Sequence, residues 1–206
     1  MINSALILVD IQNDFLPGGA LEVPGGDEVL PVANLLIARF DLVVATQDWH
    51  PQHHGSFASQ HPGHEVGESV ELAGQQQILW PDHCIQETFG AEFAPGLNTE
   101  RIRHIFPKGT DPLIDSYSGF FDNGHRRATG LAGFLEGKEI RQVVIAGLAT
   151  DYCVKFTAMD AVALGFETVL VEDGCRGVNL SPDDTSQALQ SMTEAGISLS
   201  DSRKLT

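Results

Sequence analysis

Six short apolar runs recur along the chain and predict the strands of one sheet. Most of them, such as VVIAGL and TVLV, are continuously apolar rather than alternating. Continuous runs are typical of strands that are buried on both faces, as in a parallel sheet. The predicted strands cover residues 5–10, 42–47, 102–106, 142–148, 167–171 and 197–200.

Helical patterns lie between most of these strands. In residues 27–40 the apolar positions repeat every three or four residues and share one face. Ser181 comes before Pro182 and two acids, which predicts a helix that Ser181 caps and that runs to about Ala195. The other predicted helices cover residues 129–137 and 151–165.

The alternation of strand and helix predicts the fold class. Parallel strands joined by right-handed helical crossovers form an open, doubly wound sheet with helices on both faces, as in Rossmann-like α/β proteins. No linker divides the chain, so we expect a single domain over residues 1–206. One excursion, about residues 48–101, lacks clear periodicity and holds six of the eight histidines and both tryptophans. So long a loop in a compact domain favours a functional role, here in binding metal and substrate.

The net charge of −16 limits the classes of partner. A surface this acidic repels phosphate backbones and anionic lipids, so neither nucleic acid nor a membrane is an expected partner. No apolar run approaches the roughly 20 residues of a membrane-spanning helix, and the first residues do not resemble a secretory signal. Three cysteines are a sparse and odd set for a disulfide framework, which favours a reducing cytoplasm.

Four polar residues follow the predicted strands and are expected to meet. The carboxyl ends of parallel strands share one edge of the sheet, and ligands bind there. Asp10 and Asp48 end the first two strands, Lys108 follows the third, and Cys153 begins the helix after the fourth. We therefore expect one crevice that holds two carboxylates, an ammonium and a thiol.

Cys153 is the candidate nucleophile of this crevice. A helix N-terminus and the ammonium of Lys108 would both favour the thiolate, so we expect a lowered pKa for Cys153. Asp10 would take the thiol proton and return it to a leaving amine. Asp14 is an alternative on position alone, but Asp10 directly ends the strand. Most cysteines are buried and inert, and this interpretation is kept for Cys84 and Cys175.

A second group of residues has the spacing of metal ligands. In an extended segment residues two apart point the same way, so Asp48 and His50 could bind one cation, with His83 as the third ligand. An Asp and two His suit Zn²⁺, the preferred ion here, and also Fe²⁺ or Mn²⁺, with positions left for water or substrate. The alternative is a chance pairing of exposed loop residues. Further candidate ligands are His53, His54, His61 and His64.

Several segments in this order resemble the nicotinamidases, within the isochorismatase-like hydrolases. The resemblance spans nearly the whole chain. The segments are LVDIQNDFLPGG (8–19), TQDWHPQHHGSFAS (46–59), WPDHC (80–84), FPKGTD (106–111), DSYSGFFDN (115–123) and GLATDYCVKFTAMDA (147–161). The resemblance implies a six-stranded parallel sheet and hydrolysis of nicotinamide to nicotinate and ammonia in NAD salvage, with pyrazinamide also accepted.

The resemblance also implies roles for individual residues. The catalytic triad would be Asp10, Lys108 and Cys153, and the metal ligands would be Asp48, His50 and His83. A cis peptide between Leu148 and Ala149 would let the Ala149 N–H join the Cys153 N–H as an oxyanion hole. The ring pocket would be lined by Phe15, Leu21, Trp80, Tyr117 and Ala149. Pro107 replaces a histidine that relatives often carry, and whether His54 or water completes the metal shell is left open.

Other functions are weighed against this one. An amidase acting on carbamoyl or ureido compounds would need the triad but not the metal ligands. An isochorismatase proper acts on a vinyl ether and would not need Cys153. A metal-binding regulatory module on the same scaffold is not excluded by fold alone, whereas a nucleotide-binding enzyme is disfavoured because no strand leads into G-x-G-x-x-G or a Walker loop. The sequence leaves open whether the chain forms a homo-oligomer.

Overall fold

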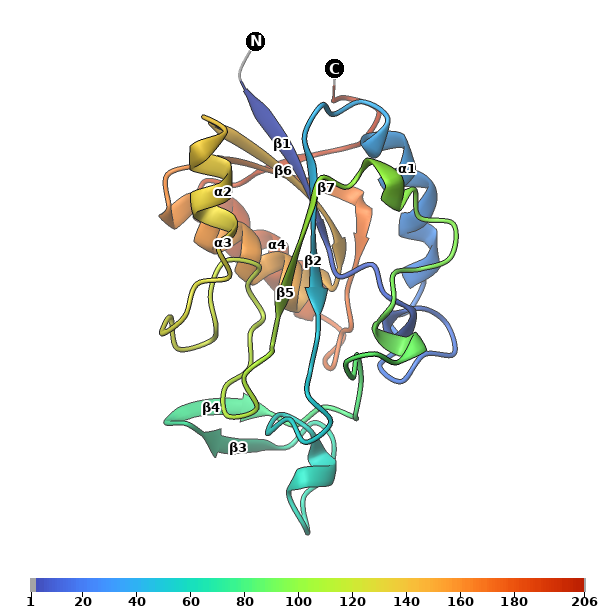
Figure 1. The fold of residues 1–206 in the computed structure, drawn as a ribbon, viewed down its shortest axis with the longest axis vertical. Helices are drawn as coiled ribbons and strands as arrows, with labels where there is room; N and C mark the ends of the chain where they lie inside the picture. Colours follow the sequence, from blue (N-terminus) through green and yellow to red (C-terminus); the bar gives the residue numbers. More distant parts are fainter. Residues whose placement is uncertain (1–2, 206) are drawn as a thin grey trace.

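The computed structural model describes residues 3–205, and its centre is a six-stranded parallel sheet (Figure 1). The strand order is β5-β2-β1-β6-β7-β8, with every neighbouring pair parallel. The prediction of an open, doubly wound sheet is therefore confirmed. The strands are β1 (Ser4–Val9), β2 (Val43–Asp48), β5 (His104–Lys108), β6 (Gln142–Leu148), β7 (Glu167–Arg176) and β8 (Ser198–Ser200).

Helices cover both faces of the sheet (Figure 1). One face packs against α1 (Val29–Ile37), and the other packs against α2 (Leu131–Gly137), α3 (Lys155–Ala163) and α4 (Asp184–Glu194). The central strand β1 contributes to both cores. Its Leu6 and Leu8 join the cluster on the α1 side, whereas Ile7 joins the cluster on the other side. Burial on both faces explains why these strands are continuously apolar.

The helix that follows β7 starts later than predicted. Ser181 does not cap it, because residues 181–183 form a turn and α4 begins at Asp184. The Ser181 N–H instead donates to the Asp184 carboxylate at 2.7 Å. The first residue of α4 therefore stabilises the turn that precedes the helix. The strand before it is longer than predicted, since β7 continues past Val171 to Arg176 after a register shift against β6.

The excursion after β2 contains a pair of strands that the apolar pattern does not predict. It is an antiparallel hairpin of β3 (Ser69–Leu72) and β4 (Gln75–Ile78), which lies beyond the carboxyl ends of β2 and β5 (Figure 1). Its second strand is rich in glutamine, so no alternation of apolar residues marks it. Among residues 3–205, no helix has the length and apolar character needed to cross a membrane.

Candidate active site and metal centre

The sheet brings Asp10, Asp48, Lys108 and Cys153 to one place. Asp10 directly follows β1, while Asp48 and Lys108 end the neighbouring strands β2 and β5 as paired residues in the parallel register. Cys153 lies in a π-helical turn, Thr150–Val154, which joins β6 to α3. The topology therefore gathers four groups that are distant in sequence at the carboxyl edge of the sheet, where ligands bind in such folds.

The Lys108 ammonium lies at the centre of this group. Its Nζ is 2.9 Å from Asp10 Oδ2 and 3.3 Å from Cys153 Sγ. It also contacts Asp48 Oδ1 and donates to the Ser116 carbonyl at 2.8 Å. Burial alone would lower the pKa of Lys108, but the two carboxylates outweigh it and raise that pKa well above its usual value. The lysine is thus held as a buried cation by four acceptors.

Asp10 has the environment of a proton acceptor near neutral pH. The carboxylate is fully buried, and its Oδ1 accepts the Thr46 hydroxyl hydrogen bond at 2.6 Å. Burial raises the pKa of Asp10 to about 6, although the Lys108 ammonium acts in the opposite direction. Its backbone is left-handed, with φ 48°, a conformation that is uncommon for residues other than glycine and that is found at functional sites.

The expectation of a lowered pKa for Cys153 is wrong for this structure. Burial raises the pKa of the Cys153 thiol well above its usual value. Lys108 favours the thiolate, but the carboxylates of Asp10 and Asp48 oppose it. The thiol therefore keeps its proton in the resting site and needs a base to become a nucleophile. Asp10 is placed to act as this base, because its carboxylate and the Cys153 sulfur both contact the Lys108 ammonium.

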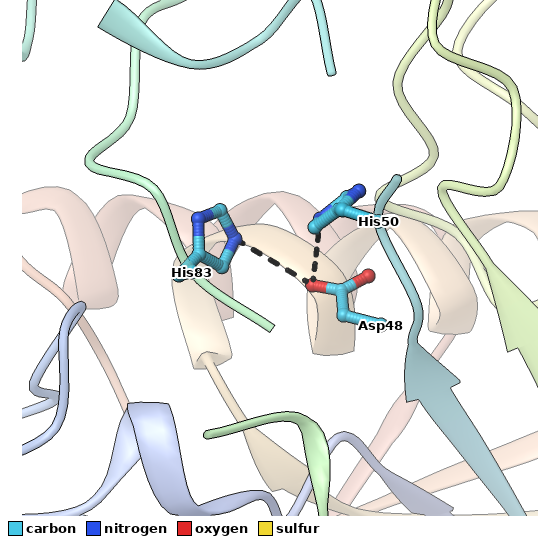
Figure 2. Close-up of side chains that lie close together, drawn as sticks. All are labelled: Asp48, His50 and His83. Atoms are coloured by element: carbon cyan, nitrogen blue, oxygen red, sulfur yellow. Dashed lines mark ion pairs between the residues drawn. The ribbon is translucent and has the colours of Figure 1, made fainter. Parts of the chain in front are cut away.

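Asp48, His50 and His83 form a second buried group beside the first (Figure 2). Nε2 of His50 lies 3.7 Å from Asp48 Oδ2, and Nε2 of His83 lies 3.9 Å from the same oxygen. Ligands of one zinc ion each lie about 2 Å from it, so two such ligands are at most about 4 Å apart. These three side chains therefore have the spacing and the donor types of a divalent metal site.

Backbone carbonyls prepare both histidines for this role. His50 Nδ1 is 2.9 Å from the Gly109 carbonyl oxygen, and His83 Nδ1 is 2.8 Å from that of Pro81. A carbonyl oxygen only accepts, so each Nδ1 carries the proton and each Nε2 keeps a lone pair that faces Asp48. Such outer contacts orient the ligands of a metal and fix their tautomer.

The other candidate ligands lie elsewhere. His54 is fully buried, but it groups with His50 and Asp115 rather than with Asp48 and His83. His53 and His64 are exposed, and His61 bonds to the Gly55 carbonyl at 2.7 Å. The alternative base Asp14 is used in the loops, since its carboxylate accepts the Cys84 N–H at 2.6 Å.

An aromatic cavity opens onto the sulfur of Cys153 and onto the group of Asp48, His50 and His83. The five residues named from the family resemblance all line it, which are Phe15, Leu21, Trp80, Tyr117 and Ala149. The rings of Trp80 and Tyr152 meet edge to face at 4.8 Å. The peptide between Leu148 and Ala149 is cis, as the resemblance implies.

Sequence reasoning missed three residues of this lining, namely Asp115, Tyr152 and Val178. Tyr152 precedes Cys153, so the strand-to-helix junction was a usable signal for it. Val178 follows the carboxyl end of β7, and it was missed because the predicted strand ended too early. Asp115 begins the segment DSYSGFFDN, so the family resemblance marked its position without giving it a role.

A family model described as the isochorismatase domain matches residues 4–204. The chain belongs to the isochorismatase family. Within that family it is 52% identical over 199 residues to a nicotinamidase of Escherichia coli, which covers 95% of this chain and 93% of that protein.

Two solved structures resemble this isochorismatase-family protein over nearly all of its length. A nicotinamidase and pyrazinamidase of Acinetobacter baumannii superposes with a TM-score of 0.97 at 46% identity, covering 100% of this chain and 99% of the other. A pyrazinamidase of Pyrococcus horikoshii in complex with zinc superposes with a TM-score of 0.79 at 40% identity, covering 97% and 99%. The likeness to nicotinamidases and pyrazinamidases supports the conclusion that this protein is an amidohydrolase.

Proposed function

We propose that this protein hydrolyses nicotinamide to nicotinate and ammonia. The observation that carries the proposal is the buried contact of Lys108 with both Asp10 and Cys153, whose thiol lines an aromatic cavity beside three side chains with the spacing of metal ligands. The nicotinamidases among its relatives support the same reaction. The family model spans residues 4–204, which supports the proposal of one domain.

The reaction begins with the thiol of Cys153. Asp10 accepts the thiol proton while Sγ attacks the carboxamide carbon, and the electron pair of the C=O bond moves onto oxygen. The backbone N–H groups of Ala149 and Cys153 bind this oxyanion, a device whose single donors contribute about 3 kcal/mol. Asp10 then returns its proton to nitrogen, the C–N bond breaks, and ammonia leaves a thioester on Cys153.

Water completes the reaction. Asp10, again a carboxylate, takes a proton from the water that attacks the thioester carbon. The C–S bond breaks, the proton returns to Cys153, and nicotinate is released. Lys108 remains charged throughout and holds Asp10 and the sulfur in register, since its ammonium contacts both.

Asp48, His50 and His83 would hold one divalent ion, for which Zn²⁺ is the proposed identity. The ion would supply a Lewis-acid contact for the pyridine nitrogen, which positions the ring. The donor set fits zinc, and a zinc complex of a related pyrazinamidase supports this choice. Phe15 and Trp80 would cover the ring faces and exclude water.

The substrate range and setting follow from the same chemistry. Pyrazinamide differs from nicotinamide by one ring nitrogen, so we expect it to be hydrolysed too. Nicotinate formation gives the reaction a place in NAD salvage. The cytoplasmic location and a homo-oligomeric state stay predictions.

Release of ammonia from nicotinamide by the purified, zinc-loaded protein tests the proposal. A coupled assay should show turnover with nicotinamide and with pyrazinamide, and mass spectrometry after acid quenching should find Cys153 acylated. Absence of ammonia from nicotinamide, with metal bound and the protein folded, would refute the proposed function.

A further inference from the structure

Gln77 stands out among the residues of the β3–β4 hairpin. The side chains of Gln75 and Gln76 are exposed, whereas Gln77 is 2% exposed. The hairpin lies beyond the carboxyl ends of β2 and β5 (Figure 1), so a side chain on its inner face is directed toward the loops that form the cavity. A buried amide side chain requires hydrogen-bond partners.

Two partners of Gln77 are walls of the cavity, while its Nε2 also lies 2.8 Å from the carbonyl oxygen of the adjacent Ile78. The same Nε2 lies 3.0 Å from Asp115 Oδ2 and 3.0 Å from the Tyr117 hydroxyl oxygen. The same hydroxyl oxygen accepts the Trp80 Nε1–H at 3.0 Å. Asp115, Tyr117 and Trp80 all line the cavity. One side chain outside the cavity thus contacts two residues that line it, Asp115 and Tyr117, and reaches Trp80 through the Tyr117 hydroxyl.

The chemistry of the partners fixes how Gln77 must lie. The Asp115 carboxylate only accepts, and its other oxygen already takes the Ser116 N–H at 2.8 Å. The amide nitrogen, and not the amide oxygen, must therefore face Asp115. This donor compensates a carboxylate that is 3% exposed, and it also holds the Tyr117 ring in place through the hydroxyl. A methionine has the same length but no donor.

We propose that Gln77 is a positioning residue for substrate binding, which fixes Tyr117 and Asp115 on the wall that faces the pyridine ring. The inference rests on the proposed function, because it assigns the β3–β4 hairpin to recognition of that substrate. Gln77 does not line the cavity, and within residues 3–205 no hydrogen bond joins it to Asp10, Lys108 or Cys153, so its loss acts on how the ring is held and leaves the acylation machinery in place.

The test compares Gln77→Met with Gln75→Met, a matched change in the same strand at an exposed position. With nicotinamide as substrate, Gln77→Met should raise KM about ten-fold, in line with the net value of a hydrogen bond or two, and change kcat by less than about two-fold. Gln75→Met should leave both constants unchanged. Should Gln77→Met fail to fold, Gln77→Asn carries the same expectation, since it keeps the amide but shortens its reach.

A double-mutant cycle separates positioning from general stability. In a Tyr117→Phe background, Gln77→Met should raise KM by less than in the wild type, because the hydroxyl that it held is already absent and only the contact with Asp115 is lost. An equal effect of Gln77→Met with and without that hydroxyl, or an unchanged KM, would overturn the inference. A wild-type protein that releases no ammonia would instead refute the proposed function, so the two failures are distinguishable.

Discussion

Replacement of Gly109 by alanine tests whether the backbone prepares the metal centre. A Cβ at this position would lie 2.3 Å from Cε1 and 2.6 Å from Nδ1 of His50, whereas carbon atoms in contact are 3.5–4.0 Å apart, roughly. The imidazole must therefore move by about 1 Å, away from the Gly109 carbonyl that holds its Nδ1 at 2.9 Å. Loss of such an outer contact typically costs about 10–100-fold in metal affinity.

Gly109→Ala has a second cost that a control variant isolates. The residue has φ +63°, and a left-handed conformation costs a residue with a Cβ about 1–2 kcal/mol. Gly63 also has a positive φ, +89°, but a Cβ there would meet nothing within 4 Å. Gly63→Ala should therefore lower the melting temperature without changing zinc affinity. Competition with a chelator measures that affinity, and an unchanged value for Gly109→Ala would refute the account of His50.

Other expected outcomes address the two centres separately. Cys153→Ala should abolish ammonia release and leave the fold and the bound zinc intact; residual turnover would show that another group is the nucleophile. His83→Ala should lower the zinc content measured by elemental analysis and raise KM for nicotinamide, and full zinc occupancy would exclude His83 as a ligand. Activity at saturating zinc should fall as the pH drops through about 6, because Asp10 must be a carboxylate to accept the thiol proton and its pKa is raised to about 6. A profile that stays flat down to pH 5 would argue against Asp10 as the base.

The fold could be predicted from sequence because the central strands of its sheet are buried on both faces. Apolar runs, most of them continuous, predict all six strands of the main sheet, and the rule for parallel sheets predicts that Asp10, Asp48 and Lys108 share one edge. The structure agrees with this rule, because Asp48 and Lys108 are paired residues at the ends of the adjacent strands β2 and β5. The apolar pattern therefore predicts the secondary-structure elements, and the topology of the parallel sheet predicts where the site lies.

The features that sequence did not predict depend on three-dimensional packing. The β3–β4 hairpin has a glutamine-rich strand whose single buried side chain, Gln77, is held by polar partners rather than by an apolar core. Val178 was not predicted to line the cavity, because β7 continues beyond the apolar run from which the strand was predicted. The pKa of Cys153 depends on burial, which outweighs the helix terminus and the ammonium that the sequence places nearby.

Asp48 belongs both to the catalytic group around Lys108 and to the group of metal-ligand candidates, and so links the two. Its Oδ1 contacts the Lys108 ammonium of the catalytic group, and its Oδ2 faces Nε2 of His50 and His83. The parallel register of β2 and β5 fixes Asp48 beside Lys108, and the Lys108 ammonium contacts the Cys153 sulfur, so one lysine links the metal-ligand group to the nucleophile. In the proposed reaction, the substrate reaches from the metal to the sulfur, with a metal-binding atom at one end and an acyl carbon at the other. A rigid aromatic ring with a nitrogen and a carboxamide does so without losing rotational freedom on binding, whereas a flexible ureido chain would have to be ordered first. The shared carboxylate therefore favours ring carboxamides over the linear substrates of other amidases built on this fold.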